Sequence, residues 1–451
     1  MRDCVSEAKS GRRQVYWPME SRGRVRFTFL ISDRKDYRGG PIVNMRRLLP
    51  RLAQRGHEIR VLGLGGDESP NLEWLRDEYG IPFEKMPSTS VTTDKGVRWV
   101  LKQLQKNRPD IFVPNIFPVG YYAARWVREA GIPTIGYCRS NGDFSWAIAE
   151  EFYYRRDEWA VSGVACVSRT LMDDLIAKSE HKNNVKYCWL PSGVPIPDQI
   201  SDQSQHCINV CYVGRFEEEA KRFRDTAGAM LRNLERGVCK HLGFFGDGTG
   251  KEWLEQEIHR RDFEDMVTIH GPVHPEELQR ELLSYQVSVL LSDYEGTPGA
   301  VMDAMATGLV PITTRIPGGT SELVSDQITG LQCVDREAAF DNCLELLANC
   351  PALRAKLAKN ARQRVSEYFS IQRTVEVFES FSEDLLATVR LKARLRAPLR
   401  VKLPPARAEL LSEDIRAETL WETAKRKLRK LHMHARKFRR FMPTRICSHA
   451  K

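Results

Sequence analysis

The chain has 451 residues, of which 42% are hydrophobic, 9% aromatic and 28% charged. These proportions are typical of a globular protein of two or three domains, and they exclude a disordered chain and a fibrous repeat. The formal net charge of +10 is unevenly distributed. Residues 390–451 contain 19 Lys or Arg and 5 Asp or Glu, a net charge of +14, which leaves −4 for residues 1–389. We therefore expect any partner that is attracted by positive charge to bind this C-terminal tail.

The sequence contains no pattern of a membrane-spanning helix or of a cleaved secretion signal. The longest uncharged stretch, residues 111–124, is interrupted by two prolines and a glycine, whereas a bilayer span needs about 20 apolar residues. Residues 1–24 are polar and lack the apolar core of a signal peptide, so we expect a flexible leader. The 11 cysteines show no paired spacing, which predicts reduced thiols in a cytoplasmic protein.

Short apolar runs alternate with helical segments from residue 25 to residue 335. This alternation predicts an α/β fold with parallel sheets buried on both faces. More than ten strands exceed what one open sheet normally holds, so we expect two Rossmann-like domains facing each other across a cleft. The expected strands are Val25–Ile31, Glu58–Leu64, Ile111–Val113, Thr134–Tyr137, Gly163–Val167, Val185–Leu190, Ile208–Val213, Leu242–Phe245, Val267–His270, Val287–Leu291, Val310–Thr313 and Gly330–Val334.

The domain boundary is expected in a polar, proline-bearing segment, because a new strand begins directly after it. In such folds ligands bind at the carboxyl ends of the strands, in the cleft between the sheets. The predicted order is a leader (1–24), a first domain (25–195), a linker (196–206), a second domain (207–370), a helix crossing back over the first domain (371–389) and a basic tail (390–451).

A pair of glycines follows the first strand. Gly39 and Gly40 precede a helix expected over residues 42–53, where backbone amides could approach a phosphate. A tight turn that needs φ > 0 explains the pair equally well. Another glycine-rich loop, Gly246–Gly250, follows a strand of the second domain and is weak evidence by itself.

Two cations follow the first strand of the second domain. Arg215 and Lys221 would enter the cleft together, where a diphosphate would be held by charge-assisted hydrogen bonds. The alternative is a solvated loop in which Glu217–Glu219 pair with Lys221 and Arg222, and residue type alone favours this alternative.

The segment Ser292–Gly308 is the most informative. Glu295 lies in a Gly/Pro loop, Asp303 lies early in the helix that follows, and Gly308 is expected to end that helix at the C′ position. The two carboxylates can therefore approach one ligand from different sides. The alternatives are an Asp303 that faces water and a Glu295 that interacts with the helix dipole. A later helix is expected to begin with Thr320 or Ser321 as its N-cap.

The order YVGRFEEEAKR, GDGTG and SDYEGTPGAVMDAMATGLVPITT resembles the retaining GT-B glycosyltransferases of family 4, also called glycosyl transferases group 1. The similarity extends over about residues 25–385 and is more specific in the second half. It implies a nucleotide-sugar donor, with UDP- or GDP-sugars favoured, held mainly by the second domain. It also implies a glycan or lipid-linked acceptor on the side of the first domain, and no required metal or other cofactor.

The resemblance assigns roles to the motif residues. Arg215 and Lys221 correspond to the cations that hold the diphosphate, Glu295 to the acid at the donor sugar, and Asp303 to the acid that binds the ribose. The other donor-binding residues that it implies are Gly39, Gly40, Gly246, Gly296, Thr297 and Pro298.

Two positions depart from the family pattern. Position 303 is usually Glu and is Asp here, one methylene shorter. Many relatives have a histidine after the strand that corresponds to residues 134–139, and this chain lacks it. Either Arg139, Ser140 or Asn141, the candidates on the acceptor side, takes over its donor-contacting role, or activity is altered or lost.

The tail has the pattern of a basic amphipathic helix over residues 417–442, with Trp421 and Phe438 on its apolar side. Such a helix in residues 390–451 would bind an anionic membrane surface. The alternatives are a coiled-coil seam and, less favoured, a nucleic-acid arm.

The sequence therefore predicts a retaining hexosyltransferase of cell-envelope or surface polysaccharide synthesis. We expect it in the cytoplasm, peripherally on the inner face of the membrane. The alternatives are a catalytically silent sugar-nucleotide-binding scaffold and a nucleotide-sugar epimerase or hydrolase on the same fold.

Overall fold

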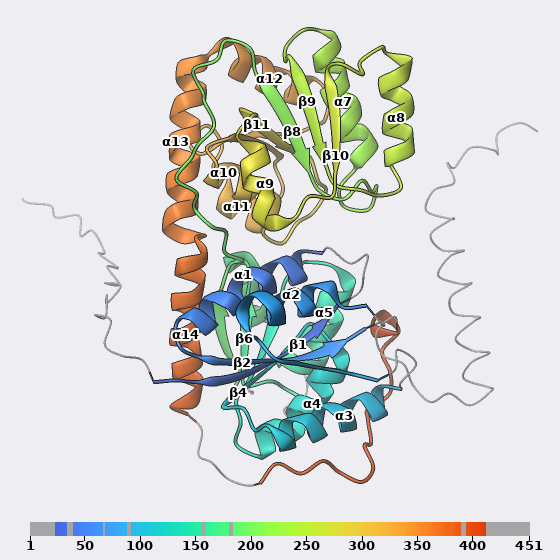
Figure 1. Cartoon of the computed structure of the whole chain (residues 1–451). Coiled ribbons are helices and arrows are strands. Elements are labelled where there is room, and N and C mark those ends of the chain that lie inside the picture. Colours follow the sequence, from blue (N-terminus) through green and yellow to red (C-terminus); the bar gives the residue numbers. More distant parts are fainter. Residues whose placement is uncertain are drawn as a thin grey trace, which may run out of the picture.

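The computed structural model describes residues 23–33, 39–65, 68–87, 92–154, 158–179, 184–388 and 394–411. These residues form two α/β domains stacked on each other, with helices α13 (Pro351–Tyr368) and α14 (Ile371–Leu386) running along one side of both (Figure 1). The helix expected within the tail lies outside the described residues, as does nearly all of the leader. Within the described part, no helix combines the length and the apolar character that crossing a bilayer requires.

The first domain is built on a seven-stranded parallel sheet with the order β3-β2-β1-β4-β5-β6-β7. Its strands are β1 Arg26–Ser32, β2 Glu58–Leu64, β3 Phe83–Lys85, β4 Ile111–Asn115, β5 Thr134–Cys138, β6 Gly163–Cys166 and β7 Lys186–Trp189. Its helices are α1 Gly40–Gln54, α2 Pro70–Tyr79, α3 Thr93–Lys106, α4 Pro118–Glu129, α5 Asp143–Ala149 and α6 Arg169–Lys178, with a π-helical turn, η1, at Glu150–Tyr154.

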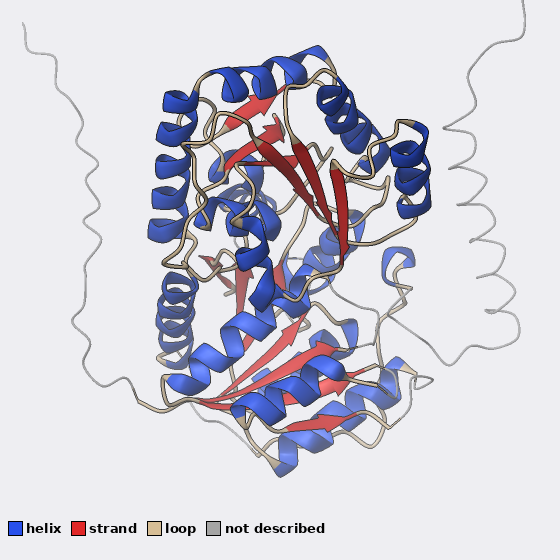
Figure 2. Cartoon of the chain, turned by 45° about the horizontal axis from the view of Figure 1, so that its top comes forward, coloured by secondary structure: helices blue, strands red, loops and turns tan. Residues whose placement is uncertain are grey.

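The second domain has a six-stranded parallel sheet with the order β10-β9-β8-β11-β12-β13. Its strands are β8 Asn209–Val213, β9 His241–Phe245, β10 Val267–Gly271, β11 Val287–Leu290, β12 Val310–Thr314 and β13 Leu331–Cys333. Its helices are α7 Phe223–Glu235, α8 Lys251–Arg260, α9 Pro275–Leu282, α10 Gly299–Ala306, α11 Gly319–Leu323 and α12 Ala338–Asn349. Figure 2 shows helices on both faces of each sheet.

The predicted fold class is confirmed, and each of the twelve expected strands is present with bounds shifted by a few residues at most. The central strands β4, β5 and β12 are buried along their whole length, which is why they read as continuous apolar runs. The sequence missed β3, because its three residues, Phe-Glu-Lys, are half-buried at the sheet edge and too few to show a period.

The segment between the two sheets is polar but fixed on the second domain. The guanidinium of Arg354 on α13 is fully buried and donates to the side chain of Gln203 at 3.1 Å and to its carbonyl at 3.0 Å. Gln203 in turn donates to the carbonyl of Gly308 at 2.8 Å. The domain bounds at residues 195 and 207 stay predictions, with β7 ending at Trp189 and β8 beginning at Asn209.

Helix α14 returns to the first domain and packs against β1. Phe378 stacks on the ring of Phe29, and Glu379 accepts from Arg55 Nε at 2.6 Å and from His57 Nε2 at 3.0 Å. The backbone N–H of Val25 donates to His57 Nδ1 at 3.3 Å, so the ring hydrogen is on Nε2. Burial opposes ionisation of Glu379, but the hydrogen bonds from His57 and Arg55 outweigh it and hold its pKa below the ordinary value.

Because the pKa of Glu379 is lowered by folding, its stabilising contribution is present above the unfolded pKa of about 4.3 and is lost as the pH falls. We expect Glu379→Gln to lower the free energy of unfolding by about 1.5–3 kcal/mol near neutral pH. The variant should also lose less stability than the wild type between neutral and acidic pH. Denaturant unfolding across this range measures both effects. Glu376→Gln, in the same helix and half-exposed, is the control, and an equal acid response in all three proteins would contradict the assignment.

Candidate active site

The loops at the carboxyl ends of the two sheets touch each other. Thr297 Oγ1 donates to the carbonyl of Val167 at 2.8 Å, between the domains. A methyl group at Gly296 would lie 2.1 Å from the carbonyl oxygen of Arg139, so only glycine allows this approach. Pro298 is the N-cap of α10, and Gly308 has φ +81° after that helix, as predicted for a C′ glycine. The predicted donor loop therefore lies against the predicted acceptor-side loop.

Lys221 and Glu295 form the ion pair at this cleft. Lys221 Nζ lies 2.5 Å from Glu295 Oε1, which also accepts from Ser292 Oγ at 2.7 Å. The side chains are 16% and 14% exposed, so the pair is shielded from water but open to a ligand. A cation and a carboxylate that come from loops 74 residues apart are thus placed side by side.

The backbone around Lys221 is strained. Ala220 and Arg222 have φ values of +61° and +48°, a conformation that costs L-residues about 1–3 kcal/mol each. The backbone N–H of Asp293 donates to the carbonyl of Ala220 at 2.8 Å and ties this loop to the one that carries Glu295. The fold therefore accepts strain to hold the Lys221 side chain against Glu295.

Arg215 is not part of this pair. Its side chain is 61% exposed and forms an ion pair with Glu217 on its own loop. The solvated-loop alternative is therefore correct for Arg215 in this conformation, whereas for Lys221 it is wrong.

Asp303 forms a second ion pair, and this one joins the two domains. Arg47 Nη2, on α1 of the first domain, lies 2.9 Å from both carboxylate oxygens, and Gln279 Nε2 donates to Oδ1 at 3.0 Å. Asp303 is 3% exposed, so the alternative in which it faces water is wrong. Burial raises the pKa of Asp303 above its ordinary value, and Arg47 counteracts this shift. No sequence pattern pointed to Arg47, which lies 256 residues from its partner.

Two further contacts close the domains on each other. Arg46 stacks on Trp74 at 3.6 Å from the ring centre and donates to Glu276 of α9 at 3.0 Å. Glu322 of α11 accepts from the backbone N–H groups of Arg169 and Thr170, at 2.8 and 2.7 Å, and so caps helix α6 of the first domain.

The expected N-cap of helix α11, Thr320 or Ser321, is wrong by two or three residues. The helix begins at Gly319 with Gly318 as N-cap, and no side chain caps it. Thr320 and Ser321 therefore lie inside its first turn. Gly318 has φ +103°, a conformation that suits glycine and not the predicted Thr or Ser.

The predicted glycines differ in what requires them. Gly39 has φ −73° and is the N-cap of α1, so a turn with φ > 0 does not explain it. Among the residues that the structure describes, apart from its chain neighbours, none outside its own helix lies within 4 Å of a methyl group placed at Gly40, so packing does not require glycine there. Gly246 has φ +143°, and a methyl group there would lie 1.9 Å from the carbonyl oxygen of Gly214. Loop packing is thus sufficient to explain Gly246.

Two of the three acceptor-side candidates, Ser140 and Asn141, contact α5, whereas Arg139 contacts α1, β4 and β5. Arg139 stacks on the ring of Tyr137 at 4.1 Å and donates to the side-chain oxygens of Asn44 and Asn115 at 3.1–3.3 Å. Ser140 Oγ lies 2.8 Å from Ser145 Oγ, and Asn141 accepts from Trp146 at 2.7 Å. Arg139 thereby links α1, β4 and the loop that contacts Gly296.

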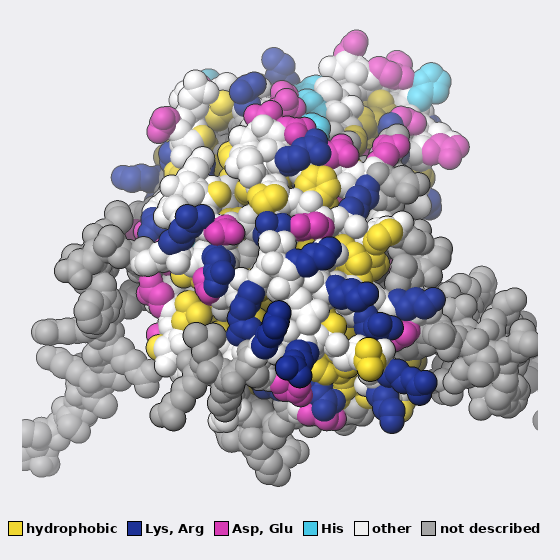
Figure 3. Space-filling model, turned by 60° about the horizontal axis from the view of Figure 1, so that its bottom comes forward, with side chains coloured by type: hydrophobic (Ala, Val, Ile, Leu, Met, Phe, Trp, Pro, Cys, Tyr) yellow, Lys and Arg dark blue, Asp and Glu magenta, His cyan; other side chains and the backbone are white. Residues whose placement is uncertain are grey.

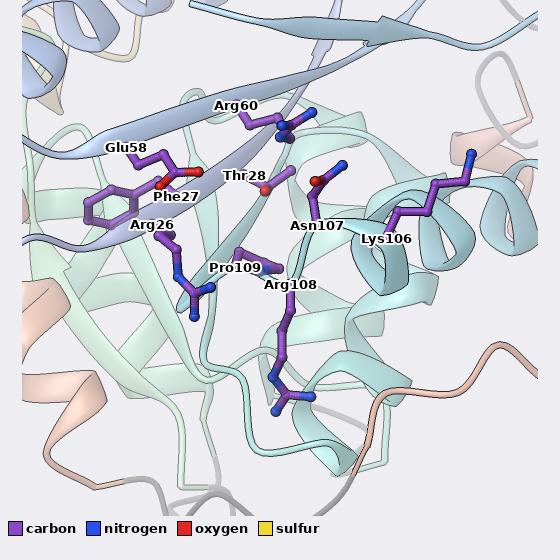
Figure 4. Close-up of a pocket in the computed structure, with 9 residues that line it drawn as sticks. All are labelled: Arg26, Phe27, Thr28, Glu58, Arg60, Lys106, Asn107, Arg108 and Pro109. Atoms are coloured by element: carbon purple, nitrogen blue, oxygen red, sulfur yellow. The ribbon is translucent and has the colours of Figure 1, made fainter.

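A hollow at the opposite, amino-terminal edge of the first sheet is less suited to an anion (Figure 4). Of its cations, Arg26 is paired with Asp110 at 2.7 Å and Arg60 with Glu84 at 2.5 Å. The cations of the Lys221–Glu295 region are paired as well, so position decides between the two: ligands of such folds bind at the carboxyl ends of the strands, where Lys221 and Glu295 lie, and not at the amino-terminal edge.

Comparisons with known proteins agree with this division of the chain. Residues 38–194 match the family model described as Glycosyltransferase Family 4, and residues 202–364 match the model described as Glycosyl transferases group 1. The chain belongs to these GT-B glycosyltransferases. The first match includes strands β2 to β7 but not β1, and the second includes the whole of the second sheet. Together they include every predicted site residue.

Individual relatives resemble parts or all of the fold. A glycogen synthase of Mycobacterium tuberculosis is 30% identical over 162 residues, which are 36% of this chain and 39% of the relative. The chain thus spans about two fifths of that relative's length. A glycosyltransferase structure from Rickettsia africae covers 81% of this chain and 100% of its own, at 14% identity and a TM-score of 0.66. Anabaena HepE, solved in complex with UDP-glucose, covers 80% and 100% at 17% identity and a TM-score of 0.62.

The Arg47–Asp303 contact allows a test of the closed cleft. Without Arg47, a buried Asp303 would be unpaired, which costs about 3–5 kcal/mol if the cleft stays closed. Opening of the domains relieves this cost by hydrating the carboxylate. We therefore expect Arg47→Ala to increase the radius of gyration in small-angle X-ray scattering and to lower the melting temperature.

The control for this test is Arg51→Ala. Arg51 lies one turn further along α1, is exposed and donates to Gln54 at 2.8 Å on the same helix. Scattering curves of Arg47→Ala that match those of the wild type and of the control would show that the ion pair does not hold the domains together.

Proposed function

We propose that the protein is a retaining hexosyltransferase that moves a sugar from a nucleotide diphosphate sugar to a glycan or lipid-linked acceptor. The observation that carries this proposal is the Lys221–Glu295 pair, with its two charges 2.5 Å apart where the domains meet. Such a pair matches a donor whose diphosphate is negative and whose sugar becomes positive as the bond breaks.

In this proposal donor binding separates the Lys221–Glu295 ion pair, and each side chain contacts a different part of the donor. The diphosphate replaces Glu295 as the counter-ion of Lys221, and the freed Glu295 lies beside the sugar. Lys221 then stabilises the negative charge that grows on the departing diphosphate. Arg215, exposed on the same loop, swings from Glu217 to the phosphates and adds a second cation. The chain's own cations would thus balance the leaving group, and we propose that no metal is needed.

Retention is assigned to a front-face route, in which the departing diphosphate itself takes the proton of the acceptor hydroxyl. Glu295 is the carboxylate nearest the proposed sugar, and the hydrogen bond from Ser292 and the contact with Lys221 hold it in place. A carboxylate there would stabilise an oxocarbenium-like transition state by charge.

The proposed nucleotide is UDP or GDP, with UDP tested first because the similar Anabaena protein was solved with UDP-glucose. Asp303 would accept from the ribose hydroxyls. The two carboxylate oxygens of Asp303 already accept two hydrogen bonds from Arg47 and one from Gln279. In this proposal the ribose hydroxyls therefore displace Arg47. The acceptor would enter beside Arg139, Ser140 and Asn141. Envelope or surface polysaccharide synthesis, at the inner face of the membrane, is the proposed setting.

A silent sugar-nucleotide-binding scaffold is the second candidate. The burial of Asp303 under Arg47 favours this candidate, because the carboxylate is already bound to a guanidinium and is not free to bind a ribose. An epimerase or hydrolase would differ from both candidates by releasing nucleotide without an acceptor.

The diphosphate role of Lys221 is tested by calorimetry with UDP. We expect Lys221→Met to weaken UDP binding by about 10- to 100-fold, because one charge-assisted hydrogen bond is lost. Lys240→Met, at an exposed position at the far end of the second sheet, should leave binding unchanged. Equal affinities in the two variants would remove Lys221 from the site.

The role of Glu295 is tested by Glu295→Gln with UDP-glucose as donor. We expect transfer to fall by about 100- to 1,000-fold, while UDP binds as tightly as before or more tightly because Lys221 has lost its counter-ion. Glu217→Gln, which alters only the partner of Arg215, is the control. Wild-type UDP release that is independent of acceptor would indicate the hydrolase, and UDP binding without any turnover would indicate the scaffold.

A further inference from the structure

Residues 394–411 form an extended strap across the first domain, outside both family matches (Figure 1). We call this segment the strap. Leu395 and Leu410 are buried, and Ala397, Val401 and Leu403 pack against the same hydrophobic cluster as α3 and α4. Leu395, Ala397, Val401 and Leu403 thus face the domain, and the even-numbered cations between them face outward. Leu399 departs from this alternation, because the chain bends at residues 399–400 and leaves it exposed.

Polar contacts fix the strap at both ends. Gln105 of α3 donates to the carbonyl of Leu395 at 3.0 Å, and Arg407 forms an ion pair with Glu150 of the π-helical turn η1. A 3-10 turn, η2 (Ala408–Leu410), packs against α5. The outward-facing side chains of the strap are therefore presented from a fixed backbone.

The outward side combines cations with one large apolar side chain. Its exposed cations are Arg394, Arg396, Arg400 and Lys402. Leu399 lies among them and is 88% exposed, more than any other large hydrophobic residue in the part of the chain that the structure describes. Water does not favour such a side chain, whereas the boundary between lipid headgroups and acyl chains does.

Helix α3, beside the strap, extends this basic surface. Lys95, Lys102 and Lys106 are exposed on it, and Asp94 is its one acidic residue. Figure 3 shows Lys and Arg side chains gathered over the lower part of the molecule, on the first domain. Anionic lipids attract such a surface by about 1 kcal/mol per cation close to the membrane.

We propose that the outward side of the strap, with α3, is a docking surface for an anionic lipid membrane, with Leu399 inserted among the headgroups. The inference rests on the proposed function in one respect: if the acceptor is lipid-linked, this surface brings the enzyme to the membrane that holds it. The strap ends on α5, whose first turn follows the acceptor-side residues Arg139–Asn141. Docking would therefore bring the lipid phase to the acceptor side of the cleft.

The test is co-sedimentation of the full-length protein with vesicles of phosphatidylcholine, alone or with phosphatidylglycerol. We expect binding only to the anionic vesicles. Leu399→Asp should reduce the partition coefficient at least ten-fold, and Arg400→Gln with Lys402→Gln should reduce it about 25-fold, at about five-fold per charge. Leu399 is exposed, so its replacement should leave the melting temperature unchanged.

The matched control is Val334→Asp, which places the same charge at a 72% exposed apolar residue of the second domain. Unchanged vesicle binding in both strap variants would overturn the proposal, even if the wild type binds through another segment. Equal binding to neutral vesicles, or binding to a polyanion such as RNA but not to vesicles, would also overturn it.

Failure of the proposed transferase function can be distinguished from failure of the docking surface. UDP affinity, measured by calorimetry on the same samples, should be equal in the wild type and in Leu399→Asp. A protein that binds anionic vesicles through the strap but does not bind UDP would retain the docking surface and lose the transferase proposal. The reverse result would retain the transferase proposal and refute the docking surface.

Discussion

The ion pair between Arg47 and Asp303 is the contact on which the closed arrangement of the domains depends. Both side chains are nearly buried, at 8% and 4% exposure, and come from opposite domains. A buried carboxylate without a partner is strongly disfavoured, so the two domains must stay together or expose it to water. The Lys221–Glu295 pair obeys the same constraint within the second domain. In the absence of a donor, each of these four charged side chains therefore has a partner of opposite charge in the protein.

This pairing changes what a donor has to do in order to bind. A diphosphate can take Lys221 from Glu295, and ribose hydroxyls can take Asp303 from Arg47, so that charge balance is kept at each step. The net gain is then the difference between two sets of contacts, and it is smaller than the energy of either set. The side chain of Asp303 is one methylene shorter than the usual Glu, so its carboxylate lies closer to the backbone of α10. The long side chain of Arg47 spans the distance from α1 to this carboxylate.

The sequence was sufficient for the parallel sheets and for the loops of the second domain, because both leave local signals. Buried strands read as apolar runs, and Glu295 and Lys221 lie in loops that directly follow such strands. Arg47 and Glu322 left no such signal. Each lies on a helix face that would be solvated in an isolated domain, and its partner is 256 or about 150 residues away. Contacts across a domain interface depend on how the domains pack, which no periodicity encodes.

The same distinction applies to the C-terminal region. A helical period over residues 417–442 drew attention to the tail, whereas residues 394–403 alternate with a period of two and resemble an edge strand. In the structure that alternation serves neither a strand nor a helix. It lets one side of an extended segment pack against the hydrophobic cluster of α3 and α4 and leaves the cations on the other side. Leu399 breaks the alternation at a bend and lies exposed among the cations. The two faces that we propose to be functional thereby lie on one domain, with α5 between the acceptor-side loop and the strap, so that the position of one face fixes the position of the other.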